Sequence, residues 1–238
     1  MLKLLFLSLL LIRFALTQHL HSQNNIPVID VFVESLCPDC MDFIGDSFKQ
    51  FQEALDHQEL AVVNFYPFGN AKESWDGSKW IFECQHGPNE CYGNIIEACA
   101  LNHLSENEGK NFLICLEGNI KKFNKNFDDT LAFCVSEESV MKNIKDCANG
   151  SEGNGLMHEV AQRTPKHNYV PWIHFNGEHD KAKENQILQN MLKFLRSGVE
   201  YGHNTNIYLE NNLRASLDFN ENKSCLNNDR NEMLNFLS

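Results

Sequence analysis

The hydrophobic residues near the start of the chain are spaced so that they predict a strand, a helix and a second strand. Residues 27–34 form an apolar run rich in β-branched side chains, which is typical of a buried strand. Ile44, Phe48, Phe51 and Leu55 then follow at steps of four, three and four residues, which places them on one face of a helix. Residues 60–66 predict a second buried strand, and turn residues at 67–70 end it. This order is typical of a parallel strand pair with a crossover helix.

The next part of the chain, residues 71–165, combines helical spacing with a high density of cysteine. Apolar residues suggest helices around residues 95–102, from residue 112 and over residues 140–147. Six of the nine cysteines fall in this part of the chain. We therefore predict a mainly helical insertion held by disulfides. The glycine-rich stretch 149–155 predicts a flexible turn.

A third strand and a last helix are expected before the chain changes character. Residues 169–178 predict a strand that ends in an Asn176–Gly177 hairpin turn. Pro171 stands at the first position of this strand, where a cis X–Pro bond could occur, the alternative being an ordinary trans proline. Residues 185–195 predict an amphipathic helix, and the Asn-rich residues 201–238 are interpreted as a tail that is open to processing. The pattern as a whole predicts one α/β domain over residues 27–200.

The first 17 residues have the layout of a secretory signal peptide. Lys3 supplies the positive charge, residues 4–11 the apolar run, and residues 15–17 a small-residue cleavage site. The run is too short to span a bilayer, and residues 18–26 are interpreted as a flexible segment. The C-terminus carries no tetrapeptide for retention in the endoplasmic reticulum. We predict a secretory-pathway protein without an integral membrane segment, and the sequence leaves open whether it is lysosomal or secreted.

The negative charge of the chain limits the classes of partner that it can bind. The formal net charge of −12 becomes −14 when Lys3 and Arg13 are removed with the leader, which argues against binding to nucleic acid or anionic membranes. All ten histidines lie after residue 17, and their protonation would reduce this charge to about −4, which suits an acidic compartment without requiring one. Asn149 and Asn222 stand in glycosylation sequons.

The sequence Cys37-Pro38-Asp39-Cys40 is the main candidate for chemistry. It follows the first predicted strand and opens the first predicted helix, which is the arrangement of a dithiol redox catalyst. With Cys37 at the N-cap and Pro38 at the first helical position, free N–H groups and the helix dipole lower the pKa of Cys37. Cys40, one turn further on, can resolve a mixed disulfide at Cys37. Because the charge of Asp39 opposes a thiolate, we expect a moderate fall in this pKa, as in a reductant or a mild exchanger.

Two other interpretations of the cysteine pair remain open, a zinc half-site and an inert structural disulfide. A zinc site would need a second pair of ligands at a similar spacing, and the other cysteines offer no second two-residue gap. Without the redox pair, seven cysteines remain, so one is free or forms an intermolecular bond. Cys225, isolated in the polar tail, is the candidate for this odd cysteine, and the spacing does not reveal how the others pair.

Residues 84–99 carry a further motif. Eight residues there stand at the fixed positions of the signature of the gamma-interferon-inducible lysosomal thiol reductase family: Cys84, Gln85, His86, Gly87, Glu90, Cys91, Asn94 and Cys99. The chain resembles this family over about residues 27–195, including residues 66–71 and 170–172. The order of its elements also looks like the thioredoxin superfamily. The resemblance implies a thioredoxin-like fold with a disulfide-stapled helical insertion, Cys37 and Cys40 as catalytic residues, and Val170 and a cis Pro171 as residues that hold substrate.

The resemblance also implies a function. Members reduce disulfides of protein substrates, unfolding or antigenic ones, at acidic pH in endosomes and lysosomes. Because the exchange reaction leaves the dithiol oxidised, we expect an external thiol as reductant, and we expect no cofactor or metal. Cys84, Cys91 and Cys99 are then expected in structural disulfides, with a second redox centre as the alternative. Glu90 and Asn94 are expected in capping or loop-fixing roles. His86 is expected as a hydrogen-bonded turn residue, with proton transfer as the alternative.

Three questions stay open at this level. Asp30 and Glu34, which flank the first predicted strand, are expected as solvated carboxylates, with a buried proton acceptor as the alternative. The opposite direction of exchange, a disulfide oxidase or isomerase, is the first alternative function. A secreted binding protein that keeps the fold without catalysis is the second.

Overall fold

The computed structural model describes residues 26–54 and 57–197 of the 238-residue chain. The predicted signal peptide, most of the segment 18–26, the tail 201–238, Asn222 and Cys225 lie outside these residues.

A three-stranded sheet forms the centre of the molecule, in the order β2-β1-β5. The middle strand, β1 (Val28–Val33), pairs in parallel with β2 (Val62–Pro67) and antiparallel with β5 (Trp172–Phe175). Every residue of β1 is buried, because it is paired along both edges and covered on both faces. The three strands predicted from the sequence are therefore confirmed, and α/β is the class of the fold.

The helical region after β1 closes the parallel crossover. It consists of α2 (Pro38–Phe43), the π-helical turn η1 (Ile44–Phe48), α3 (Lys49–Gln52) and α4 (His57–Leu60). Ile44, Phe48 and Phe51 are at most 1% exposed, which confirms the predicted apolar face, while Leu55 lies outside the described residues. Leu60 ends α4, so β2 begins two residues later than the pattern predicts.

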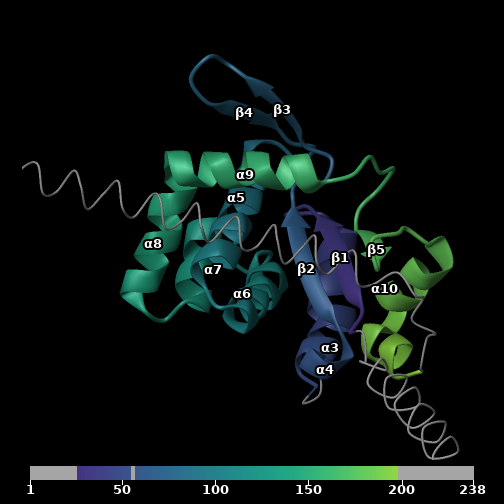
Figure 1. Cartoon of the computed structure of the whole chain (residues 1–238). Helices are drawn as coiled ribbons and strands as arrows, with labels where there is room; N and C mark the ends of the chain where they lie inside the picture. The colour runs from purple at the N-terminus through teal and green to yellow at the C-terminus, as the bar shows by residue number, and fades with distance from the viewer. Residues whose placement is uncertain (1–25, 55–56, 198–238) are drawn as a thin grey trace, which may run out of the picture.

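Between β2 and β5 the chain is mainly helical, as predicted. Its helices are α5 (Pro88–His103), α6 (Glu106–Asn119), α7 (Phe127–Cys134), α8 (Glu138–Asn149) and α9 (Ser151–Arg163). Figure 1 shows α5 to α8 gathered beyond the β2 edge of the sheet, with α10 at the opposite edge beside β5. The three disulfides of the described residues all lie in this segment: Cys84–Cys91, Cys99–Cys147 and Cys115–Cys134.

Two features of this segment differ from the prediction. A hairpin of β3 (Lys72–Trp75) and β4 (Trp80–Glu83) projects beyond α9 (Figure 1), and its short strands give little sequence signal. The expected flexible turn at 149–155 is wrong, because α9 begins at Ser151. Gly153 packs there so closely that a Cβ would lie 2.5 Å from the Cys147 carbonyl oxygen and 2.7 Å from Ile95. Tertiary packing of α9 on α5 and α8 thus overrides the low helix propensity of glycine.

The C-terminal elements begin and end differently from the pattern. Asn176 and Gly177 have φ values of 53° and 83°, which confirms the tight turn, but within the described residues it leads only to an isolated bridge between Phe175 and Glu178. The last helix, α10 (Lys181–Arg196), begins four residues earlier than predicted. Its N-cap is Asp180, whose carboxylate accepts hydrogen bonds from the N–H groups of Ala182 and Lys183.

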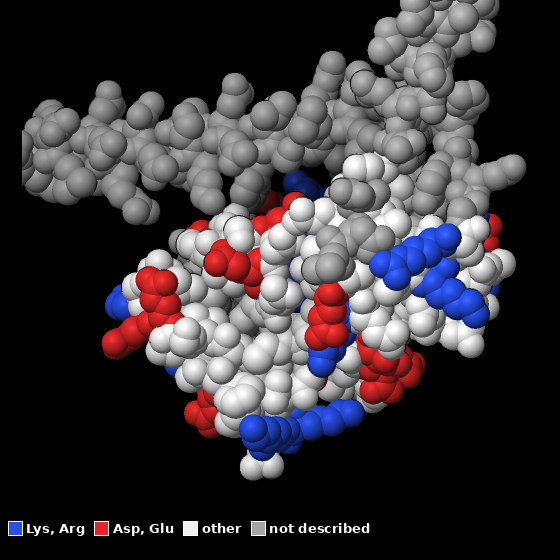
Figure 2. Space-filling view, turned by 90° about the horizontal axis from the view of Figure 1, so that it is seen from below, with Lys and Arg blue, Asp and Glu red and all other residues white. Residues whose placement is uncertain are grey.

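The surface carries both signs of charge. On the face shown in Figure 2, basic and acidic side chains form small separate groups on a largely uncharged surface. Within the described residues, no helix is both long and apolar enough to cross a membrane.

Gly93 offers a test of how closely α5 packs. A Cβ at this position would lie 2.3 Å from the Phe127 ring and 2.7 Å from the Cβ of Ser35. We expect Gly93→Ala to lower the free energy of unfolding by about 1–3 kcal/mol through overpacking, as measured by denaturant titration.

Gly155→Ala in α9 is the matched control, since nothing lies within 4 Å of its added Cβ. It should leave stability unchanged or raise it by up to about 1 kcal/mol through helix propensity. Equal effects of the two substitutions would contradict the close packing at Gly93.

Candidate active site

The strand β1 delivers two cysteines to the start of a helix. Cys37 is the N-cap of α2, with φ −75° and ψ 121°, and Pro38 is the first helical residue. Cys40 follows one turn later, and both cysteines are free thiols. Cys37 is 7% exposed and Cys40 is fully buried, so Cys37 is the thiol that a substrate can reach.

The two thiols differ strongly in acidity. The pKa of Cys37 falls from 9.0 to about 7, chiefly because the Cys40 thiol donates a hydrogen bond to its sulfur and the N–H groups of Cys40 and Asp39 act in the same direction. Burial and the negative charge of Glu34 oppose this fall. Burial raises the pKa of Cys40 well above 9.0. Because the thiolate is the nucleophile, Cys37 can attack a disulfide while Cys40 keeps its proton.

The turn before Cys37 is held in an unusual conformation. Leu36 has a φ of 66°, a left-handed backbone conformation that residues other than glycine rarely adopt. The N–H of the preceding residue, the fully buried Ser35, donates a hydrogen bond of 2.8 Å to the Asn94 side chain in α5. Asn94 also donates to the Phe68 carbonyl oxygen after β2, at 3.5 Å. The signature residue Asn94 therefore ties the cysteine turn to α5 and to the end of β2, a contact of the loop-fixing kind that the sequence suggests.

Glu34 is buried beside this turn, and the expectation of a solvated carboxylate is wrong. It is 2% exposed and accepts hydrogen bonds from the backbone and side-chain nitrogens of Asn70, at 2.8 and 3.1 Å. Gly69 leaves room for it, since a Cβ there would lie 2.3 Å from its Oε2. Burial raises the pKa of Glu34. Asp30 is likewise buried, at 1% exposure, and accepts hydrogen bonds from Asn64 and Tyr66.

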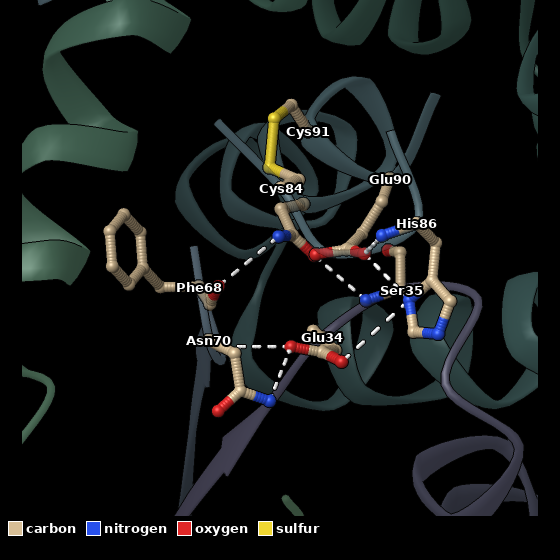
Figure 3. The surroundings of a disulfide bond; sticks show 9 residues. Glu34, Ser35, Phe68, Asn70, Cys84, His86, Glu90 and Cys91 are labelled. Atoms are coloured by element: carbon tan, nitrogen blue, oxygen red, sulfur yellow. Dashed lines mark hydrogen bonds and ion pairs between the residues drawn. A yellow bond between two sulfur atoms is a disulfide. The ribbon is translucent and has the colours of Figure 1, made fainter. Parts of the chain in front are cut away.

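The signature loop approaches Glu34 from the other side (Figure 3). Both the backbone N–H of His86 and its Nδ1 contact Glu90 Oε2, at 2.5 and 2.6 Å, and Nδ1 lies 3.7 Å from Glu34 Oε1. The Cys84–Cys91 disulfide closes the loop that carries His86. His86 is thus a hydrogen-bonded loop residue that lies between two buried carboxyl groups.

Glu34, His86 and Glu90 are also the group in this site that comes closest to a metal centre. One ligand atom from each lies within 4.8 Å of the others. His86 Nδ1 contacts Glu90 Oε2, and Asn70, from outside the group, donates two hydrogen bonds to Glu34 Oε2. The contacts seen here are those of a hydrogen-bonded cluster of two acids and a histidine.

The predicted substrate-holding residues also fall near the end of β1. The Val170–Pro171 peptide bond is cis, as the sequence suggests. Trp172, the next residue, pairs with Phe32 near the C-terminal end of β1. Pro171 therefore lies near the end of the strand that leads to Cys37. The substrate role of Val170 and Pro171 stays a prediction.

The remaining predicted residues lie apart from the thiols or support them. Cys99 pairs with Cys147 and so joins α5 to α8. Gln85 and Gly87 belong to the signature loop, and Gly87 adopts a φ of 86° just before α5. Asn149, the exposed end of α8, donates hydrogen bonds to the Lys145 carbonyl oxygen and the Tyr92 hydroxyl.

Sequence reasoning missed two functional neighbours of the thiols. Ser35 gave no signal of its own, although it stands two residues before Cys37. Glu117 in α6 is far from the thiols in sequence and lies beside them only because α6 folds back on α5.

Comparison with known proteins decides the family. The family model of gamma interferon inducible lysosomal thiol reductase matches residues 28–149. The chain belongs to this thiol reductase family. The mouse gamma-interferon-inducible lysosomal thiol reductase is 35% identical over 177 residues, 72% of this chain and 68% of its own. The goldfish (Carassius auratus) protein of the same name is 33% identical over 186 residues, 73% and 69% of the two chains.

A third relative, GILT-like protein 1 of Drosophila melanogaster, is 32% identical over 191 residues, covering 72% of this chain and 74% of the relative. Membership of the thiol reductase family makes the chain an enzyme of the thiol–disulfide oxidoreductase class. The unequal acidity of Cys37 and Cys40 is the chemistry that this class needs.

Alkylation of the reduced protein tests the asymmetry of the thiols. We expect Cys37 to react with an apparent pKa of about 7, while Cys40 stays unmodified until the protein is denatured. Mass spectrometry of the two modified peptides after brief exposure across a pH series gives both values. Equal reaction of the two thiols in the folded protein would refute the assignment of Cys37 as nucleophile.

The charge of Glu34 offers a second test, because it raises the pKa of Cys37. Glu34→Gln should speed Cys37 alkylation by about two- to threefold near pH 6, because the substitution removes a charge that opposes the thiolate. Asp42→Asn, at an exposed acid of the helix that Cys37 caps, is the matched control and should have no such effect. A slower reaction in Glu34→Gln than in Asp42→Asn would show that Glu34 instead supports the thiolate.

Proposed function

We propose that this enzyme reduces disulfide bonds of protein substrates by dithiol–disulfide exchange at Cys37 and Cys40. The observation that carries the proposal is the pair of unequal thiols at the N-terminus of α2, one of pKa about 7 and one kept protonated by burial. Reduced Cys37 attacks a substrate sulfur, the Cys40 thiol then attacks the mixed disulfide, and the reduced substrate leaves. The enzyme is left with a Cys37–Cys40 disulfide, so an external small thiol is needed to restore it.

The proposal includes work at acidic pH in the endosomal, lysosomal or secretory pathway. The printed names of the relatives in mouse and goldfish, which call them lysosomal, support the location. The signal-peptide pattern of residues 1–17 also supports this location, as do the glycosylation sequons at Asn149 and Asn222. At pH ~5 a thiol of pKa about 7 is ~1% thiolate, against about one part in ten thousand for a pKa of 9.0. The lowered pKa therefore matters most in an acidic compartment.

We further propose that the fold is thioredoxin-like, with the segment between β2 and β5 as the insertion. Three features support this: the β1–α2–β2 parallel crossover, the dithiol at the start of its helix, and the cis Val170–Pro171 bond beside β1. The cis proline would hold an extended substrate chain against Cys37. A disulfide-containing, unfolded polypeptide fits such a site better than a small molecule.

The opposite direction of exchange is the main competing function, and the reduction potential separates the two. A value at or below about −180 mV supports a reductase or isomerase, whereas a value near −120 mV supports an oxidase. Equilibration with glutathione buffers of known ratio measures it.

A trapping experiment tests the proposed reaction directly. In a Cys225→Ser background, which removes the ninth cysteine, Cys40→Ser should form a lasting mixed disulfide with a denatured, disulfide-containing protein at pH 5. The resolving thiol is absent, so the adduct at Cys37 accumulates and can be mapped by mass spectrometry.

Cys37→Ser in the same background is the control and should form no adduct. An adduct in Cys37→Ser alone would place the nucleophile at Cys40. Absence of any adduct, together with unchanged substrate disulfides in the unsubstituted enzyme, would refute the reductase and leave the non-catalytic binding protein as the better description.

A further inference from the structure

Two carboxyl groups are buried together behind the turn that carries Cys37. Glu97 in α5 is 1% exposed and Glu117 in α6 is 4% exposed. The Ser35 hydroxyl donates a hydrogen bond of 2.5 Å to Glu97 Oε1. The other oxygen of Glu97 and both oxygens of Glu117 have no donor among the described residues. Buried acceptors without a donor are rare, because burial removes their hydrogen bonds to water and no protein hydrogen bond replaces them.

A shared proton resolves this shortage of donors. Two ionised carboxylates offer only acceptors, whereas a protonated carboxyl can donate to its neighbour. Burial raises the pKa of both groups, and the negative charge of Glu97 raises that of Glu117 further. Two negative charges at this buried point would repel each other, so we expect the pair to share one proton and to carry a single negative charge.

No neighbouring cation neutralises this pair in the described structure. Lys110, on the same helix as Glu117, forms its ion pair with Glu106. Other basic side chains on α5 and on the elements packed around α5 and α6 contact other acids: Lys49 contacts Glu53, His103 contacts Glu152, Lys142 contacts Asp146, Lys145 contacts Asp128 and His158 contacts Glu73. On the side of the turn after β1, the titratable group that acts on Glu117 is Cys37, which becomes negative on ionisation. If the proton were lost, the new charge on Glu117 would therefore meet the charges of Glu97 and of the Cys37 thiolate.

The acid pair is coupled to the dithiol. Ser35, which hydrogen bonds to Glu97, stands two residues before Cys37 on the same turn. A charge on Cys37 raises the pKa of Glu117. Such coupling is reciprocal, so a charge on Glu117 makes ionisation of Cys37 harder to the same degree.

We propose that Glu117 is a positioning residue of the dithiol: it keeps the one proton shared with Glu97 and so prevents a second buried negative charge beside the Cys37 sulfur. The pair also fixes Ser35, and through it the left-handed Leu36, by the hydrogen bond to Glu97. Its value to catalysis rests on the proposed function, since only a Cys37 that must ionise benefits from a neutral Glu117. An acidic compartment favours the protonated pair.

Infrared difference spectroscopy of the full chain tests the proposal, by comparing the oxidised and reduced enzyme. At pH 6 we expect the carbonyl band of a protonated carboxylic acid, and we expect this band to shift on oxidation of Cys37 and Cys40. Glu117→Gln, whose amide can still donate to Glu97, should lose the band. Two control variants should keep the band. Glu34→Gln removes another buried acid near Cys37, and Glu108→Gln removes an exposed acid of α6.

A band that survives in Glu117→Gln, or that is absent from the unsubstituted enzyme, overturns the assignment of the proton. A purely structural acid pair would give the same band in both redox states. An identical band in the oxidised and the reduced enzyme therefore overturns the link to Cys37. These readouts use no protein substrate, so they remain decisive even if the trapping experiment finds no reductase.

The pH dependence of stability gives an independent readout. A carboxyl whose pKa is raised by folding stabilises the protein below its unfolded pKa of 4.5, and this stabilisation is lost as the pH rises through the folded pKa. The urea midpoint of the unsubstituted chain should therefore fall between pH 5 and pH 8, and that of Glu117→Gln should fall less. Equal slopes, together with the absence of the carboxylic acid band at pH 6, would show that Glu117 is ionised throughout and overturn the proposal.

Discussion

The hydrogen bond from the Ser35 N–H to Asn94 is the contact on which the active-site geometry depends. It holds the turn between β1 and α2, where Leu36 is left-handed and the chain must reverse direction before Cys37. Without such a tie, the buried N–H of Ser35 would lack a partner and the left-handed residue would cost free energy with nothing to hold it. Because the tie comes from α5, the helical segment is part of the catalytic geometry.

This dependence gives the family signature a physical role. Asn94 holds the turn, Glu90 and His86 approach Glu34 beside it, and the Cys84–Cys91 disulfide closes the loop that carries His86. The signature therefore supports the dithiol from behind and supplies no nucleophile of its own. In the proposed reaction, the two cysteines at the start of α2 carry the exchange chemistry of a thiol reductase.

Charge around the dithiol is predominantly negative and buried, which sets the enzyme a particular problem. The helix N-terminus and the Cys40 thiol favour the Cys37 thiolate, whereas burial and Glu34 oppose it. A pKa of about 7 is the balance of these effects, and it lies between that of a free thiol and that of a strong oxidase. Protonation of the surrounding carboxyls in an acidic compartment shifts this balance toward the thiolate.

The sequence by itself determined the three strands, the helix that begins at Cys37, the mainly helical cysteine-rich segment and the family. These rest on local signals, namely apolar periodicity, the two-residue cysteine spacing and the fixed positions of the signature. Only the tertiary structure decided that Glu34 is buried, that residues 151–163 form a helix, and that Glu97 and Glu117 meet behind Ser35. The reason is that burial, proton sharing and close glycine packing depend on segments that are distant in sequence, and no local pattern records which of them will meet.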